Sequence, residues 1–322
     1  MVLHNLRVRR RVAQGQFGVT PCSYGLNMYN TTGFLSKDVT DPKTTIGQYV
    51  RTNFPNMKPL QAEYKALAGD LVIDSTGANA GNVGTAVDLI VRLILEPDET
   101  PMSALILYPF HATYHQVVHE LASLVGRSGD RELAARAAWA LALCVSAHRA
   151  GAAWAPLVPD LVHSGDFTLD AMLEQADDAA VSELVALREL SEERLIPTLT
   201  GPFSLGPTFD LSKLGPTRRI AAEADLVAGG LLIDIKTTLA PKNKVGLRPD
   251  VLKPNNVYQL LGYALLDYSN QYDIDRLGIF SARYGMLTEW PLERVTSLMS
   301  GRKFDFPAAR QEVWDIMQQD VA

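Results

Sequence analysis

A Gly-Gly pair between two apolar stretches is the feature that most constrains how this chain folds. In residues 223–236, Gly229 and Gly230 separate two runs rich in Leu, Ile, Val and Ala. Both central positions of a two-residue hairpin need a positive φ, which glycine adopts without steric cost. The pair therefore predicts a β-hairpin in which Ala228 lies opposite Leu231.

This pairing fixes the register of the charged residues in the hairpin. Asp225 falls opposite Asp234, and Glu223 falls opposite Lys236. Because side chains alternate along a strand, all four are expected on one face. The other face is expected to be the core face, and its residues are Leu226, Ile233 and Ile235.

Two carboxylates in direct cross-strand contact should repel each other, because their Cβ atoms are only about 5 Å apart. A divalent cation such as Mg²⁺ would reverse the sign of that interaction. Lys236 could then stabilise charge on a phosphate or orient a water molecule. An acidic residue two positions before a lysine is common in exposed hairpins, so the prediction depends on the register of Asp225 and Asp234.

The segment Ala224-Asp225, eight further residues and then Asp234-Ile235-Lys236 resembles the signature of the PD-(D/E)XK nuclease superfamily. A predicted downstream helix carries Gln259 and Tyr263, which are one turn apart and share a face. This pair resembles the Q-x3-Y element of the RecB-like branch. The resemblance implies that Asp225 and Asp234 bind metal, that Lys236 is catalytic, and that Gln259 and Tyr263 position the phosphate or water, with Glu223 as a further site residue.

The same branch has an upstream helix in which a G-x3-H element supplies a histidine ligand. Here Gly84 is followed four residues later by Asp88, so an aspartate stands where the family has histidine. An oxygen ligand suits Mg²⁺ or Mn²⁺, which are the cofactors that the resemblance implies. Asp88 is therefore a candidate third metal ligand.

The expected fold is α/β, with a restriction-endonuclease-like core in which helices flank a mixed central sheet, plus a large helical insertion. We divide the chain into an N-terminal extension (1–82), a helical region that includes the first core helix (83–197) and the catalytic core (198–322). Apolar periodicity predicts the following helices: 44–67 with a break near Pro55 and Pro59, 83–95, 115–125, 131–149, 171–194, 256–268 and 308–318. Strands are expected within 203–220 and over 277–282 and 286–290.

The net charge of −6 over 322 residues argues against a protein that coats nucleic acid, so any such binding must be local. A basic loop after the hairpin is the expected contact with the phosphate backbone, through Lys242, Lys244, Arg248 and Lys253. The two cysteines, Cys22 and Cys144, are too few for a disulfide framework and indicate a reducing, cytoplasmic compartment. No segment has the length of a membrane span.

His111, His115 and His119 recur every fourth residue, which could suggest a zinc site. The outer two would be about 12 Å apart on a helix, too far to share an ion. His115 and His119 could supply two zinc ligands, but no third ligand is evident nearby, so we do not interpret the histidines as a zinc site. The acidic residues before Pro197 are interpreted as a solvated helix face from which one side chain could approach the site. They are Glu183, Glu189, Glu192 and Glu193.

The function implied by the resemblance is Mg²⁺- or Mn²⁺-dependent hydrolysis of nucleic acid, DNA rather than RNA. One alternative is a non-catalytic nucleic-acid-binding or assembly subunit that retains the fold, and another is an unrelated α/β metabolic enzyme. The absence of a glycine-rich phosphate loop weakens the second alternative. Whether the chain forms a homo-oligomer or binds a partner protein is left open, as is its pathway, since DNA repair and anti-phage defence both use this fold.

Overall fold

The computed structural model describes residues 33–151, 153–209 and 220–319, and these form an α/β protein around a mixed sheet. Its five strands lie in the order β2 (Phe203–Leu205), β4 (Leu226–Ala228), β5 (Leu231–Lys236), β6 (Arg276–Ser281) and β7 (Met286–Pro291). Only β5 and β6 are parallel, and α12 (Pro254–Leu266) connects them. A separate parallel pair joins β1 (Gly33–Phe34) to β3 (Ile220–Ala221). The expected α/β class is confirmed at this level.

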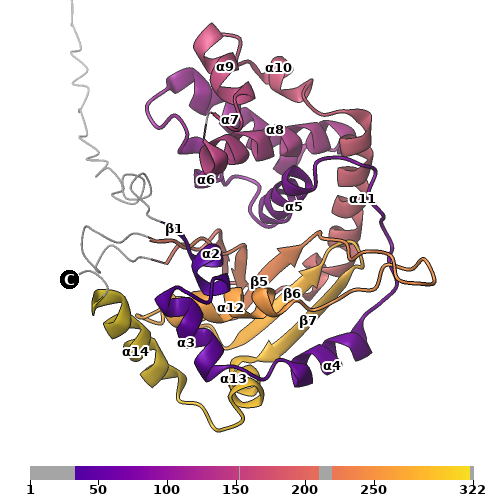
Figure 1. The fold of residues 1–322 in the computed structure, drawn as a ribbon. Helices are drawn as coiled ribbons and strands as arrows, with labels where there is room; N and C mark the ends of the chain where they lie inside the picture. The colour runs from indigo at the N-terminus through magenta and orange to yellow at the C-terminus, as the bar shows by residue number, and fades with distance from the viewer. Residues whose placement is uncertain (1–32, 152, 210–219, 320–322) are drawn as a thin grey trace, which may run out of the picture.

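Helices flank the sheet on both sides (Figure 1). The helical lobe on one side contains α5 (Ala80–Leu95), α6 (Met102–Leu105), α7 (Ala112–Arg127), α8 (Arg131–Ala150), α9 (Leu157–Ser164), α10 (Leu169–Leu173), α11 (Asp178–Arg194) and the 3₁₀ turn η2 (Ile196–Thr198). The other side contains α2 (Leu35–Thr40), α3 (Thr45–Asn53), α4 (Lys58–Leu67), α12, α13 (Leu292–Ser300) and α14 (Phe306–Gln319). Among the described residues, no helix is both long and apolar enough to cross a membrane.

Most helix predictions are confirmed within a few residues, but the one over 171–194 is wrong in its first part. The chain leaves helical geometry after α10 and restarts at α11, where the Asp177 carboxylate accepts a hydrogen bond from the backbone N–H of Ala180 at 2.7 Å. Aspartate is a strong N-cap residue, so it favours a new helix over continuation of the old one. Residues 1–32, which include Cys22, lie outside the described residues.

Two hydrophobic cores meet at β5, one on each face of the sheet. Leu231, Ile233 and Ile235 pack into the core shared with the helical lobe, whereas Leu232 packs into the core shared with α12. Our prediction of a single core face was therefore incomplete. A central strand covered on both sides is expected to be apolar almost throughout, so a charged residue within it is exceptional.

Candidate active site

The hairpin has the predicted register around its Gly-Gly turn. Ala228 lies opposite Leu231, and Gly229 and Gly230 have φ values of 51° and 82°. The strand pairing ends at Leu226, the first residue of β4, so Asp225 lies one residue before the strand. There the Asp225 carboxylate accepts a hydrogen bond from the backbone N–H of Ile235, with Oδ2 2.7 Å from the nitrogen. This bond holds Asp225 beside the end of β5 that carries Asp234 and Lys236.

Asp234 is the charged residue inside the central strand. Its side chain is buried, and the Lys236 ammonium lies 2.7 Å from each of its carboxylate oxygens. The ion pair does not satisfy the whole carboxylate, because Oδ2 accepts no hydrogen bond of acceptable geometry from the described residues. Burial raises the pKa of Asp234 to about 7 against the opposing effect of Lys236, and the charge of Asp225 adds to the rise.

A second ion-pair group brings together residues that are far apart in sequence. Arg92, one turn after Asp88 on α5, contacts that carboxylate through Nε at 2.8 Å and Nη2 at 2.7 Å, and its Nη1 lies 2.8 Å from Glu223 Oε1. The ion pair of Glu223 is therefore with Arg92 and not with Lys236, the residue predicted to lie opposite it. The partner of Glu223 comes from a helix 131 residues earlier in the chain, and hairpin register cannot indicate it.

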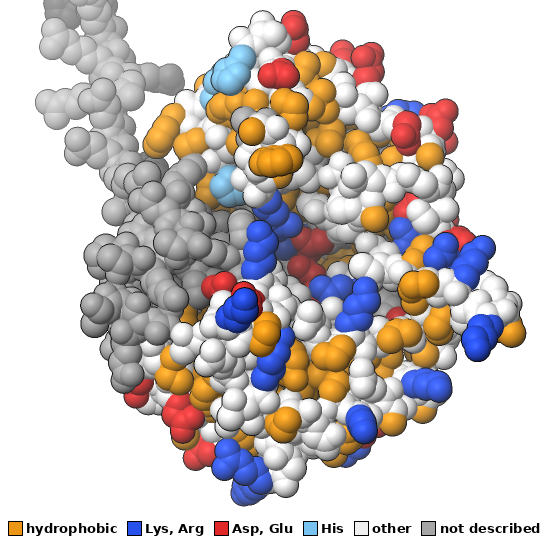
Figure 2. Space-filling view, in the orientation of Figure 1, with side chains coloured by type: hydrophobic (Ala, Val, Ile, Leu, Met, Phe, Trp, Pro, Cys, Tyr) orange, Lys and Arg blue, Asp and Glu red, His pale blue; other side chains and the backbone are white. Residues whose placement is uncertain are grey.

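The two ion-pair groups interact electrostatically. Burial raises the pKa of Asp88 to about 7 against the effect of Arg92, and the charges of Asp225 and Glu223 raise it further. The Lys236 ammonium has a raised pKa because Asp234, Asp225 and Asp88 outweigh its burial. Figure 2 shows a hollow between the helical lobe and the sheet, with acidic side chains inside it and Lys and Arg side chains around it.

The charge balance of this cluster is the property that bears most directly on its chemistry. Four carboxyl groups belong to Asp88, Glu223, Asp225 and Asp234, and two cationic groups belong to Arg92 and Lys236. Fully ionised, the cluster would have an excess of two negative charges in a site where burial penalises charge. One divalent cation would neutralise that excess.

The residues present are compatible with such a cation, although they do not form a complete ligand set. The orphaned Oδ2 of Asp234 and the neighbouring Asp225 are hard oxygen donors of the kind that Mg²⁺ prefers. Asp88, the candidate third ligand, instead has both oxygens engaged by Arg92. Across residues 33–151, 153–209 and 220–319, no group of three or more His, Cys, Asp and Glu side chains is arranged to hold an ion.

The predicted pair on α12 does lie together, at the edge of this cluster. Gln259 Nε2 donates to the Tyr263 hydroxyl at 3.2 Å, and that hydroxyl donates to the backbone carbonyl of Glu223 at 2.7 Å. Tyr263 is buried, whereas Gln259 is half-buried. Tyr263 therefore connects α12 to the segment that carries Glu223 and Asp225, and Gln259 is the more accessible of the two.

The four basic residues predicted to hold a phosphate backbone differ in their contacts. Lys242, Lys244 and Lys253 are exposed, and no ion pair is found for them in the described part of the chain. Arg248 is half-buried, with Nη1 3.0 Å from the Ala240 carbonyl oxygen and Nε 3.4 Å from Asp74. The lysines are therefore free to bind a ligand, whereas Arg248 has a structural role at the base of the loop.

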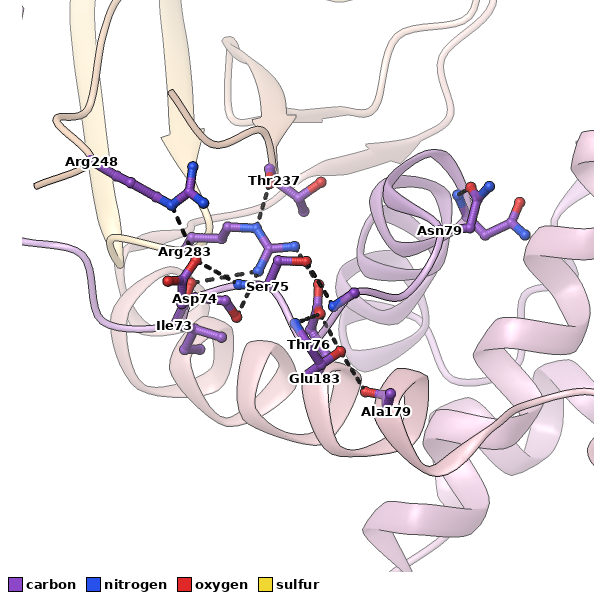
Figure 3. Close-up of polar contacts among 12 residues, drawn as sticks. Ile73, Asp74, Ser75, Thr76, Asn79, Ala179, Glu183, Thr237, Arg248 and Arg283 are labelled. Carbon is purple, nitrogen blue, oxygen red and sulfur yellow. Dashed lines mark hydrogen bonds and ion pairs between the residues drawn. The ribbon is translucent and has the colours of Figure 1, made fainter. Parts of the chain in front are cut away.

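The sequence did not reveal a buried ion pair that ties the end of β5 to the helical lobe (Figure 3). Arg283 follows β6, and its Nε donates to the Thr237 carbonyl at 2.5 Å while its Nη2 pairs with Glu183 of α11. Glu183 also accepts hydrogen bonds from the backbone N–H of Thr76 at 2.7 Å and from the Thr76 hydroxyl at 2.6 Å. Of the four glutamates considered on this helix, Glu183 is the one buried towards the sheet.

The three regularly spaced histidines each make contacts within the helical lobe. His111 caps α7 by accepting from the Tyr114 N–H at 3.1 Å, and His119 Nδ1 lies 2.6 Å from the Thr100 hydroxyl. His115 packs against the rings of Tyr114 and His119. These contacts are all local to the helical lobe.

Comparison of the chain with protein-family models, curated proteins and solved structures gave no match. The chemistry of the site is therefore interpreted from its own residues. They comprise a buried Asp–Lys pair on the central strand, a second aspartate hydrogen-bonded to that strand, and an arginine that bridges two further carboxylates.

Proposed function

We propose that this chain is a divalent-cation-dependent nuclease of the PD-(D/E)XK type that hydrolyses phosphodiester bonds, with DNA as the preferred substrate. The observation that carries the proposal is the pair of Asp234 and Lys236 inside a strand that is otherwise apolar. Burial of charge is costly, and such perturbed groups concentrate at functional sites. The mixed sheet, with helices on both sides and α12 between its parallel strands, is compatible with that core.

In this proposal Asp225 and Asp234 hold the cation, which when bound supplies Lewis-acid activation of the phosphate. Lys236 places its positive charge beside the Asp234 carboxylate, where it can stabilise negative charge that develops on a phosphate oxygen. Gln259 is accessible enough to position the phosphate or water, and Tyr263 holds the backbone of Glu223. Arg92 pairs with Asp88 and Glu223 and so orients both carboxyl groups at the border of the site.

A non-catalytic nucleic-acid-binding subunit is the second candidate, and the engagement of Asp88 by Arg92 favours it because that carboxylate is not free to bind metal. The two candidates differ in a single assay. Purified protein is incubated with linear, circular and single-stranded DNA and with RNA, each with Mg²⁺ or with EDTA. Cleavage only with Mg²⁺ supports the nuclease, and binding without cleavage under all conditions supports the subunit.

Cation binding is expected to raise thermal stability, and the increase should be larger at pH 8 than at pH 6. Burial raises the pKa of Asp234 to about 7, so the folded protein retains a proton that the unfolded chain loses near pH 4. The stability of the cation-free protein should therefore fall as the pH rises from about 4 to about 7. Protons and cations compete for the carboxylate, so Mg²⁺ restores more stability at the higher pH.

The measurement is the melting temperature with Mg²⁺, with Ca²⁺ and with EDTA at both pH values. Asp234→Asn should abolish the Mg²⁺-dependent increase. The matched control is Asp275→Asn, which changes an exposed aspartate next to the Gly-Gly turn at the far end of β5. An equal increase in Asp234→Asn and in the unmodified protein would exclude Asp234 as a ligand.

The free lysines of the basic loop are expected to contribute to DNA affinity through phosphate contacts. Each contact adds about 0.9 to the slope of log affinity against log salt concentration for duplex DNA. The double variant Lys242→Ala/Lys244→Ala should therefore flatten this slope by about 2 units and weaken binding to all sequences alike. The measurement is fluorescence anisotropy at several salt concentrations in Ca²⁺.

A matched control removes the same charge from elsewhere on the surface. Lys43 and Lys303 are both exposed. Lys43 lies between α2 and α3, and Lys303 lies between α13 and α14, which are helices on the side of the sheet opposite the helical lobe. Lys43→Ala/Lys303→Ala should leave the slope unchanged. Equal slopes for both double variants would show that the loop does not contact the phosphate backbone.

A further inference from the structure

The loop between β5 and α12 presents apolar side chains at its tip as well as lysines. Val245 is 75% exposed and Leu247 is 64% exposed, and both lie next to Lys242 and Lys244 in the chain. Figure 1 shows this loop projecting from the body of the protein. Large aliphatic side chains that are this exposed do not stabilise the isolated molecule by burial. Two of them at one projecting tip therefore indicate a binding surface.

The tip has a defined conformation. Asn243 Oδ1 accepts hydrogen bonds from the backbone N–H groups of Val245 and Leu247, each at 3.0 Å. The Asn243 N–H donates to the Leu247 carbonyl at 2.8 Å, and Gly246 has a φ of 81° that closes the turn. The two aliphatic side chains are therefore held out without needing a partner to order them, which lowers the entropic cost of binding.

The base of the loop is anchored to the body of the protein. The Arg248 guanidinium donates to the Ala240 carbonyl and pairs with Asp74, and the Arg248 carbonyl accepts from the Tyr284 hydroxyl at 3.0 Å. Further along, Asp250 accepts from the Tyr64 hydroxyl at 2.8 Å. Because its base is anchored, the loop is expected to keep its position when a ligand binds to its tip.

The number of residues between Lys236 and Val245 limits how far the loop tip can lie from the candidate active site. Val245 is nine residues after Lys236, so its Cα lies at most about 32 Å from that of Lys236. This limit is just under one helical turn of duplex DNA, about 34 Å. One turn of a duplex bound across the carboxylate cluster is therefore at least as long as the separation between Lys236 and the loop tip.

From these observations we infer that the loop tip is a wedge that inserts Val245 and Leu247 between base pairs of duplex DNA while Lys242 and Lys244 hold the flanking phosphates. The inference rests on the proposed function and adds how that site would recognise its substrate. Apolar wedges flanked by basic residues are a known means of unstacking a base step and bending the duplex. The ammonium groups of Lys242 and Lys244, which form no ion pair within the described part of the chain, favour nucleic acid over an uncharged apolar partner.

The test measures base unstacking without cleavage. Short duplexes with 2-aminopurine at successive positions are bound to the full chain in Ca²⁺, and binding is followed by anisotropy of a separate label. The unmodified protein should increase 2-aminopurine fluorescence at one or two adjacent steps. Val245→Ser/Leu247→Ser should bind with the same salt slope but give no increase. The matched control is Leu67→Ser/Val72→Ser, which removes two aliphatic side chains outside the loop that are 54% and 61% exposed and should behave like the unmodified protein.

A second readout uses cleavage in Mg²⁺. The Val245→Ser/Leu247→Ser variant should cleave fully paired duplex about 10–100-fold more slowly than the unmodified protein. The reason is that insertion of the two side chains no longer offsets the free energy of unstacking the base step. A duplex with a mismatched step should be cleaved within about twofold of the unmodified protein. If the unmodified protein bound duplex with no fluorescence increase, the wedge proposal would be wrong. It would also be wrong if the variant lost the same fraction of its cleavage rate on paired and on mismatched duplex. Neither result would contradict the proposed nuclease activity. Absence of cleavage by the unmodified protein would instead overturn the nuclease, and the fluorescence result would still decide the wedge.

Discussion

Replacing Lys236 with alanine is expected to lower the rate of phosphodiester cleavage by about 10²–10³-fold, the effect typical of losing one donor that stabilises transition-state charge. The Lys236 ammonium contacts the Asp234 carboxylate inside the central strand, so the variant loses the only positive charge found to pair with Asp234 among the described residues. Single-turnover cleavage of saturating DNA in Mg²⁺ measures the loss directly.

The same experiment needs variants that separate charge from shape. Lys236→Arg keeps the positive charge and should recover part of the rate, while Asp234→Asn keeps the shape of the carboxylate and should remove both metal binding and cleavage. Asp275→Asn again serves as the control and should cleave normally. If Lys236→Ala retained the full rate, Asp234 and Lys236 would be a structural pair and the proposed mechanism would be wrong.

Removing the Arg283 side chain is expected to destabilise the protein by about 3–5 kcal/mol, because Glu183 would then be a buried charge without its partner. Both side chains are almost fully buried, at 2% and 1% exposure. Arg283 also donates to the backbone carbonyls of Thr237 and Asp74, so its loss leaves further acceptors without donors. Urea denaturation of Arg283→Ala measures the change in the free energy of unfolding.

The control for this prediction is an ion pair on the surface. Arg127 pairs with Asp98, and both side chains are exposed, so Arg127→Ala should cost no more than about 1 kcal/mol. The double variant Glu183→Gln/Arg283→Met removes both charges and should recover part of the stability lost in Arg283→Ala. Equal losses in Arg283→Ala and Arg127→Ala would show that the buried pair does not hold the lobe to the sheet.

Local patterns were sufficient to predict the hairpin and most helices. The Gly-Gly turn fixes which residues of β4 and β5 face each other, because a two-residue loop sets the pairing of the residues on either side of it. The same register places Asp225 near Asp234. Gln259 and Tyr263 were predicted to share a face because they are one helical turn apart, and the structure places them in contact.

Contacts made across long sequence separations could not be predicted in this way. Glu223 pairs with Arg92, and nothing near either residue in the sequence indicates that α5 packs beside the hairpin. Glu183 was one of several glutamates on a helix with little amphipathic pattern, so only the packing of α11 against the sheet distinguishes it. The interaction of Arg92 with Asp88 likewise changes the environment of a residue that spacing alone suggested as a free ligand.

The position of β5 between two hydrophobic cores has a consequence for how the chain can be divided. The helical lobe begins and ends at clear points in the sequence, near residues 80 and 199, yet its core continues into Leu226, Ile233 and Phe280 of the sheet. A truncated protein without those helices would expose one entire face of the central strands to water. The lobe is therefore an integral part of one folding unit, and neither it nor the sheet is a candidate for expression as an isolated fragment.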